Sequence, residues 1–269
     1  MTENGMAKSV GKGRVVLVTG AGSGIGRVAV DTLLAQGYRV VASARPGPKA
    51  DRLAVELAAT AGDDAMVVPA DVSDEGHIDA LFATCEATLG PPWGLVASAG
   101  RRQPRTPVLD LSTDLWDAVL NNNLRGSFLV NRRAAQSMAR AGGGVIVNVS
   151  SVSGKIARTG QTAYAVSKAA INHLTEVLAL ELAHHGIRVN AVCPGTTATP
   201  MIDLAQSQDS ASLMDERING SLELFRPGIP LRRVATAQDQ ADSICFLLSD
   251  RARHITGQVL YVDGGETVI

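Results

Sequence analysis

The chain of 269 residues has few aromatic side chains and almost no net charge. Phe, Trp and Tyr together make up 3% of it, and the formal net charge is −1. A strongly basic surface for nucleic acid or anionic lipid is therefore not expected. Nucleic acid bases would also find few aromatic rings on which to stack. We expect a small-molecule substrate as the partner, and neither nucleic acid nor a membrane.

Long apolar runs are missing as well. No run approaches the ~20 apolar residues that a membrane-spanning helix needs. The first dozen residues, MTENGMAKSVGK, lack the apolar core of a signal peptide. The sequence thus predicts a cytoplasmic protein in which residues 1–12 form a flexible tail.

Cysteine is scarce, and its placement does not indicate disulfides. Cys85, Cys193 and Cys245 are odd in number, far apart along the chain and set among apolar residues. We expect reduced core side chains. The five histidines have no carboxylate or cysteine partners at the spacing of metal ligands, so no metal site is predicted.

What the sequence does contain is a regular alternation of short apolar runs and longer helical patterns. The seven runs are RVVLV, YRVVAS, AMVVPA, WGLVAS, GVIVNVS, IRVNAVCPG and GQVLYVDGG. They are apolar throughout, which is typical of strands covered on both faces. The longest predicted helices cover about Ser112 to Ala141 and Thr162 to His184. Residues 13–269 are therefore expected to form one α/β domain of the Rossmann type, a doubly wound, seven-stranded parallel sheet with helices on both faces.

A cluster of glycines follows the first run, in VVLVTGAGSGIG. At a strand-to-helix turn, bare backbone amides and the positive end of a helix can meet a phosphate. Gly20 is expected to make the tight turn, while Gly24 and Gly26 admit a pyrophosphate and let the helix pack closely. The spacing G-x-x-x-G-x-G differs from the commoner G-x-G-x-x-G fingerprint, so an ordinary glycine-rich turn stays open at this point.

The second run ends in Ser43-Ala44-Arg45, at the place where an acid would hold the ribose 2′-hydroxyl of NAD. No carboxylate is present, and the guanidinium of Arg45 can pair with the 2′-phosphate of NADP. We therefore favour NADP(H) as the cofactor. NAD(H) remains the alternative if Arg45 only begins a solvated loop, and Ser23 stands where a basic residue would have been a second phosphate contact.

The segment SSVSGKIARTGQTAYAVSKAA carries the candidate chemistry. Tyr164 and Lys168 are four residues apart in a helical pattern, so they share one face. A nearby ammonium favours the phenolate and lowers the pKa of a tyrosine, which would let Tyr164 act as an acid or base near neutral pH. Ser151, at the end of an apolar strand, would hydrogen-bond the substrate oxygen.

The order of these motifs resembles the short-chain dehydrogenase/reductase family. The matching elements are TGAGSGIG, DV at positions 71 and 72, NNNLRGSF, the Ser, Tyr and Lys set, IRVNAVCPGTTATPM and ITGQVLYVDGG. They cover nearly the whole chain. The resemblance implies hydride transfer between a nicotinamide cofactor and a secondary alcohol or ketone. It also implies a homotetramer in which the two long helices pair across subunits.

The resemblance implies a role for each matching position. Lys168 would lower the pKa of the catalytic Tyr164 and hold the nicotinamide ribose, while Asn123 would support a water relay to the lysine. Asp71 and Val72 would contact the adenine. The other expected cofactor contacts are Gly20, Ser23, Gly24, Ile25, Gly26, Arg45, Ala99, Gly100, Pro194, Gly195, Thr197 and Thr199. One departure from the family pattern stands after the fourth strand, where Asn-Asn-Ala-Gly is replaced by Ala-Ser-Ala-Gly, which puts hydrogen bonding at the sheet edge in doubt.

The segment of about residues 196–232 is expected to be a substrate lid, because it follows the Pro-Gly turn of the sixth run. Its apolar residues would suit an apolar or alicyclic substrate. Four arginines could instead hold a carboxylate at the pocket mouth: Arg101, Arg102, Arg105 and Arg158. The candidate substrate contacts are Arg101, Arg158 and Met201.

Three functions remain open from the sequence. The favoured one is an NADP(H)-dependent oxidoreductase of a small cyclic or aliphatic alcohol or ketone. The C-terminal part of the chain resembles the branch that oxidises 2,3-dihydro-2,3-dihydroxybenzoate, through the stretch ERINGSLELFRPGIPLRRVATAQD together with Arg158 and PGTTATPM. An NAD-dependent dehydrogenase of a carboxylated cyclohexadiene diol is therefore the alternative. A non-catalytic dinucleotide-binding regulator is the third, and the intact Ser, Tyr, Lys and Asn set argues against it.

Overall fold

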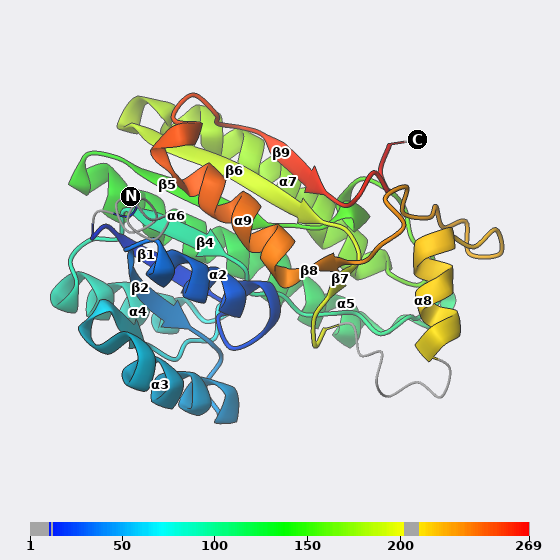
Figure 1. Ribbon diagram of the computed structural model, residues 1–269, viewed down its shortest axis with the longest axis horizontal. Coiled ribbons are helices and arrows are strands. Elements are labelled where there is room, and N and C mark those ends of the chain that lie inside the picture. Colours follow the sequence, from blue (N-terminus) through cyan, green and yellow to red (C-terminus); the bar gives the residue numbers. More distant parts are fainter. Residues whose placement is uncertain (1–10, 12, 202–209, 269) are drawn as a thin grey trace, which may run out of the picture.

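The computed structural model describes residues 11, 13–201 and 210–268, with 210–213 as backbone only, and in this part of the chain seven parallel strands form one sheet (Figure 1). This confirms the predicted doubly wound fold. The order across the sheet is β3 (Ala65–Val67), β2 (Arg39–Ser43), β1 (Val15–Thr19), β4 (Gly94–Ala97), β5 (Gly144–Val149), β6 (Ile187–Pro194) and β9 (Val259–Val262).

Helices cover both faces of the sheet, and the strand residues explain why. Val16 and Val18 of β1 belong to one apolar core, whereas Val15 and Leu17 belong to the other, because successive side chains of a strand point to opposite faces. The first core is closed by α2 (Gly24–Ala35), α3 (Pro48–Ala61) and α9 (Ala237–Leu248). The second core is closed by α4 (Glu75–Thr88), α6 (Gly126–Ala141) and α7 (Thr162–Leu182).

The predicted helix over 112–141 is interrupted in the structure. It consists of α5 (Thr113–Leu120), a π-helical turn (Asn121–Arg125) and α6. A π turn inserts an extra residue into the helical repeat and is frequent at functional sites. Here it buries Asn122 and Asn123. The other long helix ends as predicted, in a 3-10 turn that follows α7.

The predicted lid segment leaves the sheet at its carboxyl edge. It contains β7 (Thr197–Ala198), which pairs with β8 (Ala235–Thr236), and α8 (Ser210–Asn219), which Figure 1 shows beyond the carboxyl ends of the strands. Residues 202–209 of the lid lie outside the described residues. So does the predicted tail, apart from Gly11.

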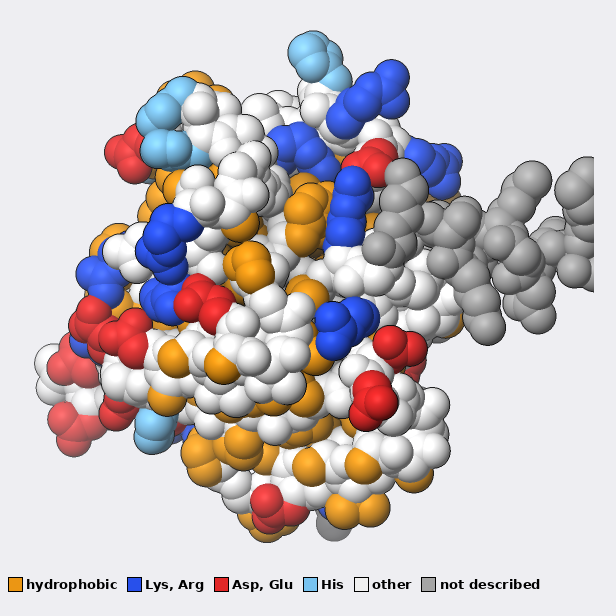
Figure 2. Space-filling model, turned by 90° about the vertical axis from the view of Figure 1, so that its left-hand side faces the viewer, with side chains coloured by type: hydrophobic (Ala, Val, Ile, Leu, Met, Phe, Trp, Pro, Cys, Tyr) orange, Lys and Arg blue, Asp and Glu red, His pale blue; other side chains and the backbone are white. Residues whose placement is uncertain are grey.

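The three cysteines are buried and free, as predicted. Among the described residues no helix is long and apolar enough to cross a membrane. On the face shown in Figure 2, acidic and basic side chains are interspersed, in line with the net charge of −1.

Candidate active site

A cavity of about 630 Å³ opens at the carboxyl edge of the sheet, where β1, β4, β5 and β6 end. The strand order reverses between β1 and β4, and Rossmann-type sheets bind their ligands at this point. Every site residue predicted from the sequence lines this cavity except Asn123. The fold therefore brings the glycine turn, the Ser, Tyr and Lys set and part of the lid segment into one place.

The glycine turn leaves no room for side chains. Gly20 has a φ of +69°, and a Cβ there would lie 2.7 Å from the backbone of Ala99. A Cβ on Gly26 would lie 2.4 Å from the carbonyl oxygen of Gly20. Ser23 precedes α2 but forms no capping hydrogen bond, so the first amides of the helix keep their donors for a ligand. This cradle fits the pyrophosphate of a dinucleotide.

Arg45 lies beside Asp71 at one end of the cavity. The Nε of Arg45 lies 3.2 Å from the Oδ2 of Asp71, and the Arg45 side chain is 58% exposed. Burial alone would raise the pKa of Asp71, but hydrogen bonds from Ser73 and the charge of Arg45 hold it below its usual range. Lys49 also lines this end. The sequence reasoning missed Lys49, although a cation four residues after Arg45 was a visible signal.

The missing family asparagines after β4 do not disturb the sheet. β4 pairs with both β1 and β5 up to Ala97. The amide of Ala99 then donates to the hydroxyl of Thr19 at 3.4 Å, and Ser98 lines the cavity. The doubt raised by the sequence about this edge is thereby removed.

Asn123 lies fully buried in the π-helical turn and clamps the backbone that follows β4. Its Oδ1 accepts a hydrogen bond from the amide of Arg101 at 2.7 Å. Its Nδ2 donates to the carbonyl of Arg101 at 3.1 Å and to the hydroxyl of Ser167 at 3.1 Å. Asn123 thus fixes the loop opposite the catalytic candidates, while the predicted water relay stays a proposal.

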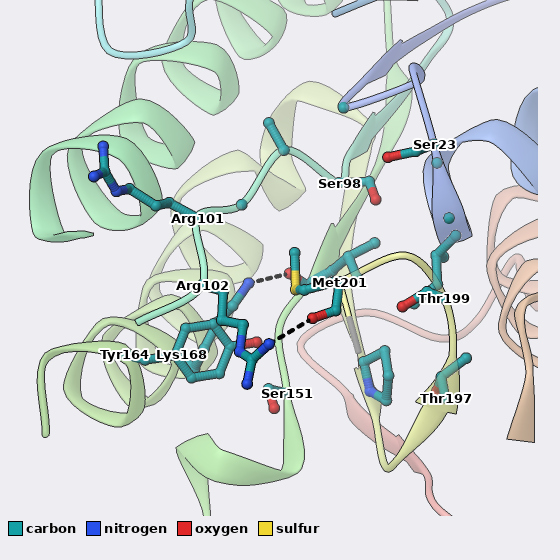
Figure 3. Close-up of a pocket in the computed structure, with 18 of the residues that line it drawn as sticks. Ser23, Ser98, Arg101, Arg102, Ser151, Tyr164, Lys168, Thr197, Thr199 and Met201 are labelled. Atoms are coloured by element: carbon teal, nitrogen blue, oxygen red, sulfur yellow. Dashed lines mark hydrogen bonds between the residues drawn. The ribbon is translucent and has the colours of Figure 1, made fainter. Parts of the chain in front are cut away.

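Ser151, Tyr164 and Lys168 meet in the middle of the cavity (Figure 3). Ser151 follows β5, its hydroxyl accepts a hydrogen bond from the amide of Ser153 at 3.1 Å, and it acts to lower the pKa of Tyr164. Lys168 lies one turn further along α7, and its Nζ donates to the carbonyl of Val149 at 2.8 Å. Buried Gln103, which the sequence reasoning missed, accepts a hydrogen bond from the Tyr164 amide at 3.1 Å and so fixes the start of α7.

The protonation of this pair differs from the prediction. Burial raises the pKa of Tyr164, and the hydrogen bond from Ser151 only partly offsets this effect. Burial also lowers the pKa of Lys168 to about 8. The predicted lowering of the Tyr164 pKa by Lys168 is wrong for this structure, because the ammonium is engaged by Val149 and lies 5.7 Å from the centroid of the tyrosine ring.

The described part of the lid segment supplies two arginines to the cavity besides the apolar Pro200 and Met201. Leu222 and Phe225 are 97% and 85% exposed. Arg217 and Arg226 line the cavity instead, and the sequence reasoning did not single them out although both lie in the ERINGSLELFRPG stretch. Of the described lid residues predicted to touch substrate, Met201 lines the cavity and is 43% exposed.

The predicted substrate arginines differ in placement. Figure 3 shows the side chain of Arg101 pointing away from Ser151 and Tyr164. Arg102 donates to the carbonyl of Met201 at 3.2 Å. Arg158 is buried, and its Nη2 lies 2.6 Å from the carboxylate of Glu266. Only Arg158 among these three is held inside the cavity wall.

The described part of the chain contains no group of three or more His, Cys, Asp or Glu side chains that could hold a metal ion.

The cavity combines a glycine cradle at the switch point of a doubly wound sheet with the hydroxyls of Ser151 and Tyr164 and the ammonium of Lys168. This combination is typical of a class of nicotinamide-dependent oxidoreductases. The chain belongs to the short-chain dehydrogenase/reductase family, whose members use NAD(P)(H) and act on alcohol or ketone substrates. The family model that matches residues 20–267 is described as enoyl-(acyl carrier protein) reductase.

Three similar proteins show the range of the family around this chain. 2,3-Dihydro-2,3-dihydroxybenzoate dehydrogenase of Bacillus subtilis is 38% identical over 96% of this chain and 97% of its own. Cis-4-hydroxycyclohexanecarboxylate dehydrogenase of Sinomonas cyclohexanicum is 36% identical over 95% of this chain and 97% of its own. A short-chain type dehydrogenase/reductase from Mycobacterium ulcerans superposes with a TM-score of 0.84 at 32% identity, covering 95% of this chain and 90% of the other.

Proposed function

We propose that this enzyme interconverts a secondary alcohol and a ketone on a small cyclic or aliphatic substrate, with NADP(H) as the cofactor and Tyr164 as the acid and base. The observation that carries the proposal is that Ser151, Tyr164 and Lys168 line the same cavity as the glycine cradle. A carbonyl oxygen placed at the hydroxyls of Ser151 and Tyr164 would be polarised from two sides.

The bound nicotinamide supplies the hydride in reduction and accepts it in oxidation. In reduction Tyr164 donates its proton to the oxygen of the former ketone, and in oxidation it takes the proton from the alcohol. Ser151 holds that oxygen in place. Lys168 lines the same cavity one helical turn beyond Tyr164, where its side chain would hold the nicotinamide ribose.

The preference for NADP(H) rests on Arg45 and Lys49. Both lie at the end of the cavity where β2 stops, and neither position carries an acid that would bind a ribose 2′-hydroxyl. The ion pair with Asp71 keeps Arg45 at this rim. NAD(H) is the alternative if that pairing withholds the guanidinium from a 2′-phosphate.

A second candidate substrate class is a carboxylated cyclohexadiene diol, oxidised with NAD. The names of the relatives from Bacillus subtilis and Sinomonas cyclohexanicum both describe ring alcohols that carry a carboxylate. The arginines at the substrate end of the cavity favour such a group. A non-catalytic regulator is disfavoured, because the Ser, Tyr, Lys and Asn set is intact.

Turnover of a ring ketone with NADPH tests the proposal. We expect the wild-type enzyme to oxidise NADPH in the presence of a panel of cyclohexanones and diketones. Tyr164→Phe removes the proton donor, so kcat is expected to fall by about 10²–10⁴-fold while NADPH still binds. Retained turnover in this variant would remove Tyr164 from the acid and base role, and no turnover by the wild type with any ketone or alcohol would favour the regulator.

A further inference from the structure

Three arginines from separate segments converge at the substrate end of the cavity. Arg158 comes from the loop before α7, Arg217 from α8 and Arg226 from the turn that follows α8. Burial lowers the pKa of Arg217, and burial together with the charge of Arg158 lowers the pKa of Arg226 to about 10. Cations placed this close together in a partly dry site repel one another and favour the binding of an anion.

One buried carboxylate holds two of these arginines. Glu266 is 1% exposed, and its Oε1 lies 2.6 Å from the Nη2 of Arg158 and 3.2 Å from the Nη2 of Arg226. Arg217 forms no ion pair within the described residues, and the neighbouring Glu216 lies 3.6 Å from Arg105 instead. Glu266 thus pairs with two of the three arginines, and Glu216 acts on Arg217 and Arg226 through its charge without an ion pair to either within the described residues.

Hydrogen-bonding capacity remains unused in this cluster. Among the described residues, the Nη1 of Arg158 and the Nε of Arg226 are buried without a hydrogen-bond partner, in side chains that are 9% and 10% exposed. The Oε2 of Glu266 also has no partner there. A buried donor of a charged group that lacks a partner destabilises the protein. Such a cluster is typical of a binding site that a ligand completes.

We propose that Arg158, Arg217 and Arg226 bind a carboxylate carried by the substrate, and that Glu266 positions two of them. This inference rests on the proposed function, since it places the carboxylate in the same cavity as the reacting carbon. The planar guanidinium fork matches the two oxygens of a carboxylate. The substrate class is thus a small ring alcohol or ketone acid rather than a neutral alcohol.

The position of the cluster sets where the carboxylate lies on the substrate. Arg158 and Tyr164 line the same cavity, and the charge of Arg158 acts to lower the pKa of Tyr164. Arg226 also donates to the hydroxyl of Thr196, next to the Pro-Gly turn of β6. A ring small enough to fit between Tyr164 and Arg226 would join the reacting carbon to the carboxylate.

Calorimetric titration of the enzyme–NADPH complex tests the inference without any turnover. The probes are benzoate, benzamide and phenyl phosphate, which share a ring and differ in the group on it. We expect benzoate to bind at least about tenfold more tightly than benzamide, since a charge-assisted hydrogen bond contributes that much or more. Equal binding of benzoate and benzamide would overturn the proposal, and tenfold tighter binding of phenyl phosphate would replace the carboxylate with a phosphate.

Two variants and a matched control assign the effect to the cluster. Arg217→Gln and Arg226→Gln are each expected to reduce the ratio of benzoate to benzamide affinity about tenfold. Arg232→Gln, on an exposed arginine of the same segment that does not line the cavity, should leave the ratio unchanged. If Arg226→Gln fails to fold, Arg217→Gln decides alone, because Arg217 takes part in no described ion pair.

Two further outcomes distinguish a failure of this inference from a failure of the proposed function. If the variants weaken NADPH binding as much as benzoate binding, the cluster belongs to the cofactor and the proposal fails. If benzoate binding depends on the arginines but no ring ketone is turned over, the carboxylate subsite stands and the proposed function fails instead.

Discussion

Lys168 lies one helical turn beyond Tyr164 on α7, with its Nζ 5.7 Å from the centroid of the tyrosine ring and 2.8 Å from the carbonyl oxygen of Val149. Both side chains are buried, so burial raises the pKa of the tyrosine and lowers that of the lysine to about 8. In the protein without a ligand the tyrosine hydroxyl is therefore neutral. A neutral hydroxyl is the form that can donate a proton to a ketone.

The first prediction concerns the stability effect of the buried lysine. Its pKa in the folded chain, about 8, lies below the ordinary value of 10.5, so the unfolded chain binds more protons between these two pH values. The free energy of unfolding should therefore rise with pH across this window, by up to about 3 kcal/mol. In Lys168→Met no ammonium titrates, so this rise should be absent and the variant should be the more stable protein at pH 7.

Urea unfolding of both proteins at pH 7 and at pH 10 measures this difference. The difference in unfolding free energy between the variant and the wild type should shrink as the pH rises. The lost hydrogen bond to Val149 changes this difference by the same amount at both pH values. A gap that is independent of pH would mean that Lys168 keeps its ordinary pKa.

The second prediction concerns the cofactor. Titration of the wild-type enzyme, followed by nicotinamide fluorescence, should show at least tenfold tighter binding of NADPH than of NADH, about 1.4 kcal/mol. Arg45→Ala and Lys49→Ala should each reduce this preference, because each removes a cation from the rim of the cavity. Arg52→Ala, on an exposed arginine of α3 that does not line the cavity, is the control. A preference for NADH would direct the search to dihydrodiol carboxylates.

The third prediction concerns the glycine turn. Gly20→Ala places a residue with a Cβ at a φ of +69° and brings that Cβ to 2.7 Å from the Ala99 backbone. The left-handed conformation alone destabilises alanine by about 1–2 kcal/mol, and the overlap adds about 1–3 kcal/mol. NADPH binding should weaken as well, because the cradle must open.

Gly142→Ala is the matched control for this substitution. Gly142 has a φ of +89° and a ψ of +18°, in the left-handed region, with nothing within 4 Å of the position of a Cβ, so only the conformational penalty applies. Thermal unfolding and NADPH titration of both variants provide the comparison. Equal losses of stability would show that the contact with Ala99 is not restrictive.

The fourth prediction concerns assembly, for which we propose a homotetramer. A groove on the outer side of α5, the π-helical turn and α7 is lined by Leu124, Phe128 and Leu174, and Phe128 is 42% exposed. Phe128→Glu would place a charge on this apolar surface and should shift the mass measured by light scattering to smaller species. Val55→Glu, at an exposed position of α3, should leave the mass unchanged. A monomeric wild-type protein would contradict the proposed tetramer.

Several features could be predicted from the sequence because their cause is local. The apolar runs and their helical connections specify a doubly covered parallel sheet, since each element must bury its own apolar face. Gly20 follows β1 directly, Gly26 lies in the first turn of α2, and the spacing of Tyr164 and Lys168 needs only one turn of helix. These features came from neighbouring residues, and the structure places them in one cavity.

Other features depend on contacts between distant segments, and only the tertiary structure decided them. The sign of the Tyr164 pKa shift depends on burial, which no local pattern records. The pairing of Glu266 with Arg158 spans 108 residues of chain, and the approach of Arg226 to the same carboxylate adds a third segment. Sequence alone determined the fold and the candidate reacting groups. The packing of distant loops around the carboxyl edge decided which charges face the substrate, because electrostatic effects depend on distance and burial rather than on order along the chain.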